Sequence, residues 1–239
     1  MASGPTGQSV NHDGDMCTPS SSGKVFVVGV CGGSGSGKTT ISAKIKAELG
    51  KNCAYLCHDM YYRDQTARSM EARVRTNYDH PQSLETELMT AHLRELKAGR
   101  AVLVPEYDFD VHTRKGGLNW QQTSGQKIQP ASVVLVEGIL IFENEAMRDE
   151  IDLRIFVECD ADLRFIRRMD RDILPTTEGG RGRKIADVVT QYIETVRPMH
   201  NLFVEPSKHF AHIILPYDQW NPSGDGAILR AIIREVTGE

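Results

Sequence analysis

Short apolar runs of strand length recur along most of the chain. Several of them are apolar at every position, which is typical of strands that are covered on both faces of a parallel sheet. They cover residues 25–30, 53–57, 101–104, 133–136, 153–157 and 212–215. We expect these runs to form the strands of one sheet.

Helical patterns with recognisable ends separate the runs. The first helix follows Gly37, the second has an N-cap at Ser83 and ends at Gly99, and a third begins after Asp160. A fourth carries an apolar stripe and is expected to end before Pro198. The stripe consists of Ile185, Val188, Val189, Tyr192 and Val196. This alternation of strands and helices predicts an α/β fold with a doubly wound parallel sheet.

The two ends of the pattern and two interruptions suggest the domain organisation. Residues 1–23 are rich in Ser, Gly and Pro and have almost no apolar residues, so we expect a disordered N-terminal tail. One domain of residues 24–239 would follow. A segment at about 105–130 is interpreted as an inserted β-hairpin or loop that binds substrate, and a Gly- and Arg-rich segment at about 173–184 as a mobile, helical lid.

A phosphate-binding motif lies between the first run and the first helix. Gly32-Gly33-Ser34-Gly35-Ser36-Gly37-Lys38-Thr39, followed by Thr40, fits the pattern G-x-x-x-x-G-K-[ST]. In such a loop the glycines let backbone N–H groups converge on phosphates at the positive end of the following helix. Lys38 would reach the β and γ phosphates, and the Thr39 hydroxyl would bind Mg²⁺.

Three classes of protein that use this loop must be separated: small-molecule kinases, GTP-driven switches and ATP-driven motors. A switch normally carries the segments D-x-x-G and N-K-x-D, and neither occurs in the chain. A motor normally has a strongly basic track for its polymer, whereas 28 Lys+Arg and 32 Asp+Glu give a net charge of −4. The sequence therefore favours a small-molecule kinase that has no nucleic acid polymer as a partner.

Two carboxylates are placed for phosphoryl transfer. Asp59 comes just after the run at 53–57 and Glu137 directly after the run at 133–136, so both are expected at the carboxyl edge of the sheet. A kinase needs a carboxylate to take the proton of the acceptor hydroxyl, and Mg²⁺ needs oxygen ligands. Asp59 is the candidate general base, and the alternative is that it is only a cap or turn residue. Glu137 is the candidate Mg²⁺ ligand, and the alternative is that it is an exposed acid in a loop.

Arginines gather near the predicted lid. Arg164, Arg168 and Arg171 share one face of the third helix, and Arg181 and Arg183 lie in the lid. Their guanidinium groups could stabilise the charge that phosphoryl transfer spreads over the transferred group, although a solvated basic face is the alternative.

Taken together, these segments resemble the uridine kinase (uridine-cytidine kinase) family over residues 24–238. The phosphate loop is shared by many families, whereas Asp79-His80-Pro81 and Tyr107-Asp108-Phe109-x-x-His112-x-Arg114 are far more specific to this one. The resemblance also includes residues 58–63, 136–140, 167–172, 181–183, 191–192, 196–199 and 205–208. The connection between Asp172 and Arg181 is longer than is usual for the family.

Carried over position by position, the resemblance implies a complete site. Asp59 would be the general base for the nucleoside 5′-hydroxyl, with Lys38 as the other catalytic residue, and Asp79 would hold the ribose hydroxyls. Aromatic faces and a polar contact at position 4 of the pyrimidine would come from Tyr107, Phe109 and His112. The nucleoside site would be completed by Tyr62, Arg168, Arg183 and Gln191; Arg171, Arg181 and the phosphate loop would hold the triphosphate, and Thr39 and Glu137 would hold Mg²⁺.

The resemblance also implies an activity and a setting. The chain would phosphorylate uridine, and cytidine as well, with ATP (or GTP) and Mg²⁺, in pyrimidine salvage, as a cytoplasmic homotetramer or other homo-oligomer. No membrane partner is expected, because the longest apolar stretch, 133–142, is broken by Glu137 and Gly138. The alternatives are a related P-loop kinase of the pantothenate or ribulose-phosphate type and a nucleotide-sensing module.

Overall fold

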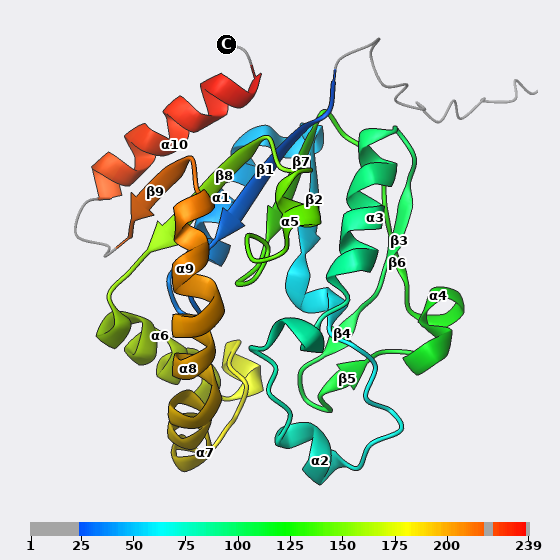
Figure 1. Cartoon of the computed structure of the whole chain (residues 1–239), viewed down its shortest axis with the longest axis vertical. Coiled ribbons are helices and arrows are strands. Elements are labelled where there is room, and N and C mark those ends of the chain that lie inside the picture. Colours follow the sequence, from blue (N-terminus) through cyan, green and yellow to red (C-terminus); the bar gives the residue numbers. More distant parts are fainter. Residues whose placement is uncertain (1–23, 218–221, 238–239) are drawn as a thin grey trace, which may run out of the picture.

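The structure is a computed structural model, and it describes residues 24–217 and 222–237. The tail predicted over residues 1–23 lies outside these ranges. The described chain forms a central parallel sheet with helices on both faces, as Figure 1 shows. The predicted α/β fold with a doubly wound sheet is confirmed.

The central sheet has five parallel strands in the order β2, β7, β1, β8, β9. They are β1 (Phe26–Cys31), β2 (Cys53–Cys57), β7 (Val133–Glu137), β8 (Leu153–Glu158) and β9 (Ile213–Pro216). The register of the first three places Val30, Glu137 and Cys57 side by side. The segments that follow these residues therefore leave the sheet at one place on its carboxyl edge.

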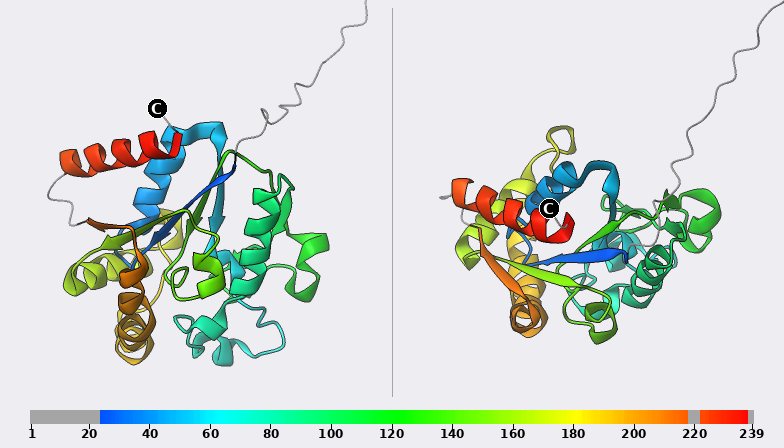
Figure 2. Two further views of the ribbon diagram at one scale, coloured as in Figure 1. Left: turned by 45° about the horizontal axis from the view of Figure 1, so that its top comes forward. Right: turned by 90° about the horizontal axis from the view of Figure 1, so that it is seen from above.

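Alternate strand residues face opposite layers of helices. On β1, Val28 packs with α1 and α10, whereas Val27 belongs to the core beneath α3 and α5. Figure 2 shows these helix pairs on opposite sides of the sheet. Their bounds are α1 (Lys38–Leu49), α3 (Thr86–Lys97), α5 (Glu145–Arg148) and α10 (Pro222–Thr237). Burial on both faces is the reason that these strands are apolar at consecutive positions.

One predicted strand lies outside the central sheet. The run at 101–104 forms β3 (Val102–Val104), which pairs antiparallel with β6 (Gln126–Ile128) in a separate two-stranded sheet. The prediction that this run joins the parallel sheet is wrong. Val102 and Val104 are buried in the same apolar cluster as α3. An apolar run predicts that a strand is buried, but it does not predict which strand it pairs with.

The predicted start of the second helix is also wrong. Helix α3 begins at Thr86, and Ser83 lies in a preceding 3₁₀ turn, η3 (Pro81–Ser83). The Ser83 hydroxyl donates hydrogen bonds to the carbonyls of Tyr78 and His80 instead of capping a helix. Ser forms such local side-chain to backbone bonds in turns as readily as it caps helices.

The fourth predicted helix does not end before Pro198. Helix α7 (Ile185–Gln191) continues through α8 (Arg197–Met199) to α9 (Glu205–Ser207), with π-helical turns over 192–196 and 200–204. Each wide turn ends shortly before a proline, Pro198 or Pro206. A widened turn accommodates the ring and its missing N–H, so the helix continues where a regular one would break.

The remaining elements include the two segments that interrupt the alternation of strands and helices. Residues 105–130 contain the hairpin of β4 (Tyr107–Asp108) and β5 (Thr113–Arg114), followed by α4 (Trp120–Thr123). Helix α2 (Met70–Val74) precedes α3, and α6 (Ala161–Ile173) is joined to α7 by the lid segment, residues 174–184. No helix in the described ranges is both long enough and apolar enough to cross a bilayer.

Candidate active site

The phosphate loop connects β1 to α1 at the carboxyl edge of the sheet. Gly35 and Gly37 have φ angles of 81° and 96°, which favour glycine. A Cβ on Gly35 would lie 2.2 Å from the carbonyl oxygen of Arg164, and one on Gly37 would lie 2.3 Å from the ring of Tyr217. The loop is therefore held by close contacts that only glycine permits at these two positions.

A cavity of about 510 Å³ opens over this loop. Its lining residues are Gly35, Gly37, Lys38, Thr39, Thr40, Arg167, Arg171 and Tyr217. Gly32, Gly33 and Ser36, which the motif also predicts at the nucleotide, line neither this cavity nor its neighbour. Backbone N–H groups, a helix N-terminus and the three cations Lys38, Arg167 and Arg171 suit a polyphosphate here.

A second cavity, of about 550 Å³, shares Lys38 and Arg171 with the first. It is lined by all of the residues predicted for the nucleoside: Asp59, Tyr62, Asp79, Tyr107, Phe109, His112, Arg168, Arg183 and Gln191. It is also lined by four residues predicted at the triphosphate: Ser34, Lys38, Arg171 and Arg181. The two cavities thus meet at the point where a phosphoryl group could pass from one to the other.

Asp59 reaches the acceptor cavity from a 3₁₀ turn, η2 (His58–Tyr61), just after β2. His58 in the same turn is fully buried, and its Nε2 lies 3.1 Å from the Thr86 hydroxyl. Burial lowers the pKa of His58 to about 4, so this histidine is a neutral packing residue. Asp79 is also buried, and burial raises the pKa of its carboxyl group while Arg168 opposes the shift.

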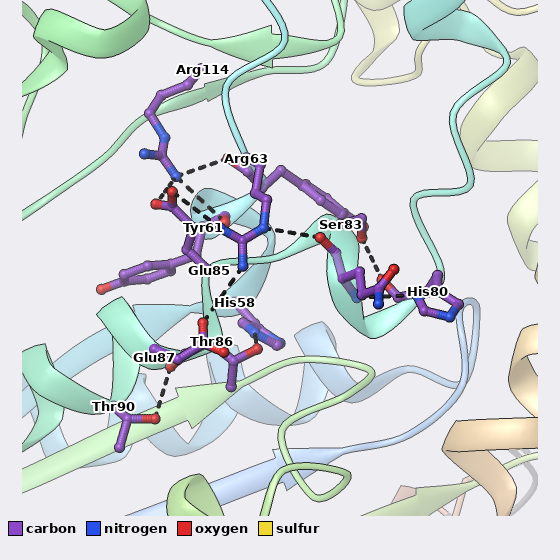
Figure 3. Close-up of polar contacts among 12 residues, drawn as sticks. His58, Tyr61, Arg63, His80, Ser83, Glu85, Thr86, Glu87, Thr90 and Arg114 are labelled. Atoms are coloured by element: carbon purple, nitrogen blue, oxygen red, sulfur yellow. Dashed lines mark hydrogen bonds and ion pairs between the residues drawn. The ribbon is translucent and has the colours of Figure 1, made fainter.

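Arg114 fixes the position of this turn relative to the inserted hairpin. Its guanidinium group is buried and donates to Glu85 Oε2 at 2.8 Å and to the Tyr62 carbonyl at 2.9 Å, as Figure 3 shows in part. Arg63 approaches the same carboxylate from the other side, at 3.6 Å. Arg114 therefore links η2, the turn that carries Asp59, to β5, the strand that follows His112.

The aromatic wall of the acceptor cavity comes from three separate segments. The rings of Tyr62 and Tyr107 lie 4.9 Å apart, and the ring of Tyr107 is 5.1 Å from that of Phe109. Tyr78 stacks on His112 at 5.7 Å and donates a hydrogen bond from its hydroxyl to the His112 carbonyl. Faces of this kind suit a flat heterocyclic base.

His112 has an unusual backbone. Its φ angle of 52° is the only positive one among the described residues other than glycine, and strained backbone of this kind is often found at functional sites. Burial, together with Arg183 and Arg181, lowers the pKa of His112 to about 4. Its ring is therefore neutral near pH 7, with one nitrogen able to donate and the other to accept.

Three arginines connect neighbouring segments of the acceptor cavity. Arg168 donates to the Ser34 hydroxyl and to Gln191 Oε1, each at 2.9 Å, and Arg183 reaches the same Gln191 oxygen at 3.3 Å. The guanidinium of Arg181 lies 4.7 Å from the ring centre of Phe109. The lid segment thus contacts both α7 and the inserted hairpin.

Arg164 does not join this group. Its Nε donates to the Cys159 carbonyl at 3.0 Å, and it packs behind the phosphate loop, near Gly33. The shared helix face that the sequence predicts therefore divides: Arg168 and Arg171 face the cavities, and Arg164 supports the loop.

Glu137 lies under the phosphate loop with its carboxylate buried. The Thr39 hydroxyl donates to its Oε1 at 2.6 Å, and the Tyr55 hydroxyl donates to its Oε2 at 2.6 Å. Thr39 and Glu137 therefore offer two adjacent oxygens beside the nucleotide cavity, a donor set that fits Mg²⁺.

Several residues of the site were not assigned from the sequence. Tyr78 and Ile139 line the acceptor cavity, and Arg167 and Tyr217 line the nucleotide cavity. Tyr217 comes directly after β9, at the same sheet edge as Asp59, so the position alone could have identified it. Tyr55 carries no comparable signal, because its role depends on Glu137, which is distant in the chain. Asp172 lies close in sequence to its four arginines, but Arg181 and Arg183 reach it only because the lid segment folds back onto α6.

A phosphate loop at the end of β1, a carboxylate after β2 and another at the end of β7 define the class of P-loop phosphotransferases. The Phosphoribulokinase / Uridine kinase family model matches residues 27–221. The chain belongs to this family, which confirms the resemblance drawn from its motifs.

Individual relatives agree. The chain is 44% identical over 213 residues to the uridine kinase of Clostridium perfringens, covering 89% of this chain and 96% of that one. It is also 44% identical over 202 residues to the uridine kinase of Lactococcus lactis subsp. cremoris, covering 84% and 92%. Among solved structures, the phosphoribulokinase of Rhodobacter spheroides has a TM-score of 0.56 at 17% identity, over 81% of this chain and 70% of that one. This structural likeness supports the fold.

Proposed function

We propose that the chain transfers the γ-phosphoryl group of ATP to the 5′-hydroxyl of uridine, and of cytidine as a second substrate. The observation that carries the proposal is the junction of the two cavities at Lys38 and Arg171, with Asp59 on the acceptor side. The 44% identity to uridine kinases over most of both chains supports the choice of acceptor.

In this proposal each side of the junction has its own task. The 5′-oxygen of the nucleoside bonds to the γ phosphorus, and Asp59 accepts the proton that this hydroxyl loses. The bond between the γ phosphorus and the β–γ bridging oxygen breaks, which releases ADP. Lys38 and Arg171 face the transferred group and stabilise its charge. Thr39 and Glu137 would hold Mg²⁺, which would neutralise charge on the phosphates.

The acceptor is held by the remaining residues. Asp79 would accept hydrogen bonds from the ribose hydroxyls, as a buried carboxylate suited to sugar hydroxyls. Tyr107 and Phe109 would cover the faces of the pyrimidine, and neutral His112 would contact position 4. Because a neutral imidazole has both a donor and an acceptor, it can pair with the carbonyl of uridine or the amine of cytidine. Contacts from Tyr62, Arg168, Arg183 and Gln191 complete this site.

The setting is proposed as well. We place the enzyme in the cytoplasm, in pyrimidine salvage, as a homotetramer or other homo-oligomer. Exposed apolar side chains along α7 to α9 support self-association: Ile185, Ile193 and Leu202 are 56%, 62% and 59% exposed. Sedimentation of the purified protein tests it, and a monomer at micromolar concentration would contradict it.

One assay tests the activity. The purified protein is incubated with ATP or GTP and Mg²⁺ and offered uridine, cytidine, adenosine, thymidine, pantothenate or ribulose 5-phosphate. We expect UMP and CMP as the products. Phosphorylation of pantothenate or ribulose 5-phosphate in preference to the pyrimidine nucleosides would overturn the proposal in favour of a related kinase, and nucleotide binding without any transfer would favour a sensing module.

A further inference from the structure

Tyr55 on β2 is hydrogen bonded to the buried carboxylate of Glu137. Its hydroxyl donates to Glu137 Oε2, while the Thr39 hydroxyl donates to Oε1, and both distances are 2.6 Å. Glu137 is only 3% exposed, so little water competes for its oxygens. Each carboxylate oxygen is thus held by a hydroxyl from a different element, one from α1 and one from β2.

The sheet register explains how Tyr55 reaches this carboxylate. Tyr55 is paired with Leu135 and Cys57 with Glu137 on the neighbouring parallel strand. Tyr55 therefore stands two residues before the level of Glu137, and residues two apart in a strand share a face. A tyrosine side chain is long enough to cross this diagonal, and its hydroxyl reaches Glu137 Oε2.

The ring of Tyr55 is itself held in place. Lys46 of α1 lies with its Nζ 5.2 Å from the ring centre, and the ring packs in the core between α1 and the sheet. The hydroxyl is therefore aimed by packing on one side and by Glu137 on the other. Tyr55 does not line the acceptor cavity, and its ring lies on the α1 side of the sheet.

We propose that Tyr55 is a positioning residue for the divalent cation that accompanies the nucleotide. By holding Oε2, it orients Glu137 so that Oε1 faces Thr39 and the phosphate loop. The proposal rests on the proposed function only in requiring a nucleotide that binds with a metal ion. Partners that orient a metal ligand typically change metal affinity by about 10- to 100-fold when they are removed.

The test compares ATP binding by the Tyr55→Phe protein and the wild type, by calorimetry without any nucleoside. Phenylalanine keeps the ring and its contact with Lys46 and removes only the hydroxyl. In EDTA, we expect both proteins to bind ATP with the same affinity. Mg²⁺ should raise the ATP affinity of both, but Tyr55→Phe should need about ten times more Mg²⁺ than the wild type to reach half of that increase. Mn²⁺ binding in the presence of ATP, followed by electron paramagnetic resonance, should weaken in parallel.

Tyr61→Phe is the matched control. Tyr61 is also a buried tyrosine, and its hydroxyl lies 3.0 Å from His92 Nδ1, away from both cavities. Its removal should leave the Mg²⁺ dependence unchanged. An unchanged Mg²⁺ dependence in Tyr55→Phe would overturn the proposal, as would an equal loss of ATP affinity in EDTA and in Mg²⁺. A wild-type protein that binds ATP with Mg²⁺ but phosphorylates no nucleoside would instead overturn the proposed function alone.

Discussion

The carboxylate of Asp172 is completely buried and accepts a hydrogen bond of 2.8 Å from Nε of Arg171. Guanidinium nitrogens of Arg181, Arg168 and Arg183 also lie near it, at 3.5, 3.6 and 3.9 Å. One carboxylate therefore stands among four cations that face the two cavities. Burial opposes its ionisation, but the guanidinium groups, Arg171 foremost, outweigh burial and hold the pKa of Asp172 below its ordinary value.

Asp172→Asn should destabilise the protein in the absence of nucleotide, because four mutually repelling cations lose their buried anion. We expect a loss of about 3 kcal/mol in the free energy of unfolding at pH 7, measured with urea. The pKa of Asp172 is lower in the folded than in the unfolded state. Its contribution to the free energy of unfolding is therefore complete above the unfolded pKa of about 4, and it is lost as the pH falls below that value. The difference between the two proteins should therefore be constant from pH 8 to 5 and narrow in more acidic solution.

Asp170→Asn is the control for that experiment. Asp170 lies on the same helix, and its side chain is exposed. Its replacement should change stability little. Equal effects of the two substitutions would show that Asp172 has no special part in holding the arginines.

Asp59→Asn should remove the proposed base while keeping the shape of the side chain. We expect kcat to fall by about 10²- to 10⁴-fold and the affinity for ATP to stay unchanged. Asp64→Asn serves as the control, because the Asp64 carboxylate accepts hydrogen bonds from Thr66 and Thr113 outside the cavities. Turnover that survives in Asp59→Asn would contradict the assignment.

The discrimination between uridine and cytidine should not depend on pH near neutrality. The pKa of His112 is lowered to about 4, so the imidazole stays uncharged until the pH falls to that region. We expect the ratio of kcat/KM for the two nucleosides to be constant from pH 5.5 to 8 and to change in His112→Ala. A ratio that titrates with a midpoint near 6.5, the ordinary value for histidine, would argue against this environment.

The phosphate loop should not tolerate a methyl group at Gly35. Its φ of 81° and the 2.2 Å approach of a Cβ to the Arg164 carbonyl mean that Gly35→Ala must displace the loop. We expect kcat/KM for ATP to fall by about 100-fold, as small displacements of positioning groups can cause. Gly50→Ala is the matched control, with a φ of 54° and no atom within 4 Å of its Cβ. It should cost about 1 kcal/mol in stability and leave ATP use intact.

The local chemistry of this protein follows from its amino-acid sequence alone. The phosphate loop is continuous in the chain, so its spacing already specifies the turn, the lysine and the hydroxyl that follow β1. Asp59 and Glu137 could be placed because each stands near the end of a buried strand, and parallel strands end at a common edge. The roles of Tyr107, Phe109 and His112 came from family resemblance, and the structure places these residues together in one cavity.

Which distant residues meet depends on how the chain folds in three dimensions. An apolar pattern shows that residues 101–104 are buried, but the partner strand depends on space left by the rest of the fold. A proline predicts a helix end, yet the π-helical turn at 192–196 lets the helix continue past Pro198. The hydroxyl of Tyr55 reaches Glu137 because of the strand register, and Arg181 and Arg183 reach Asp172 because the lid segment folds back onto α6. Such contacts act over a few ångströms in space and leave no periodic trace along the chain.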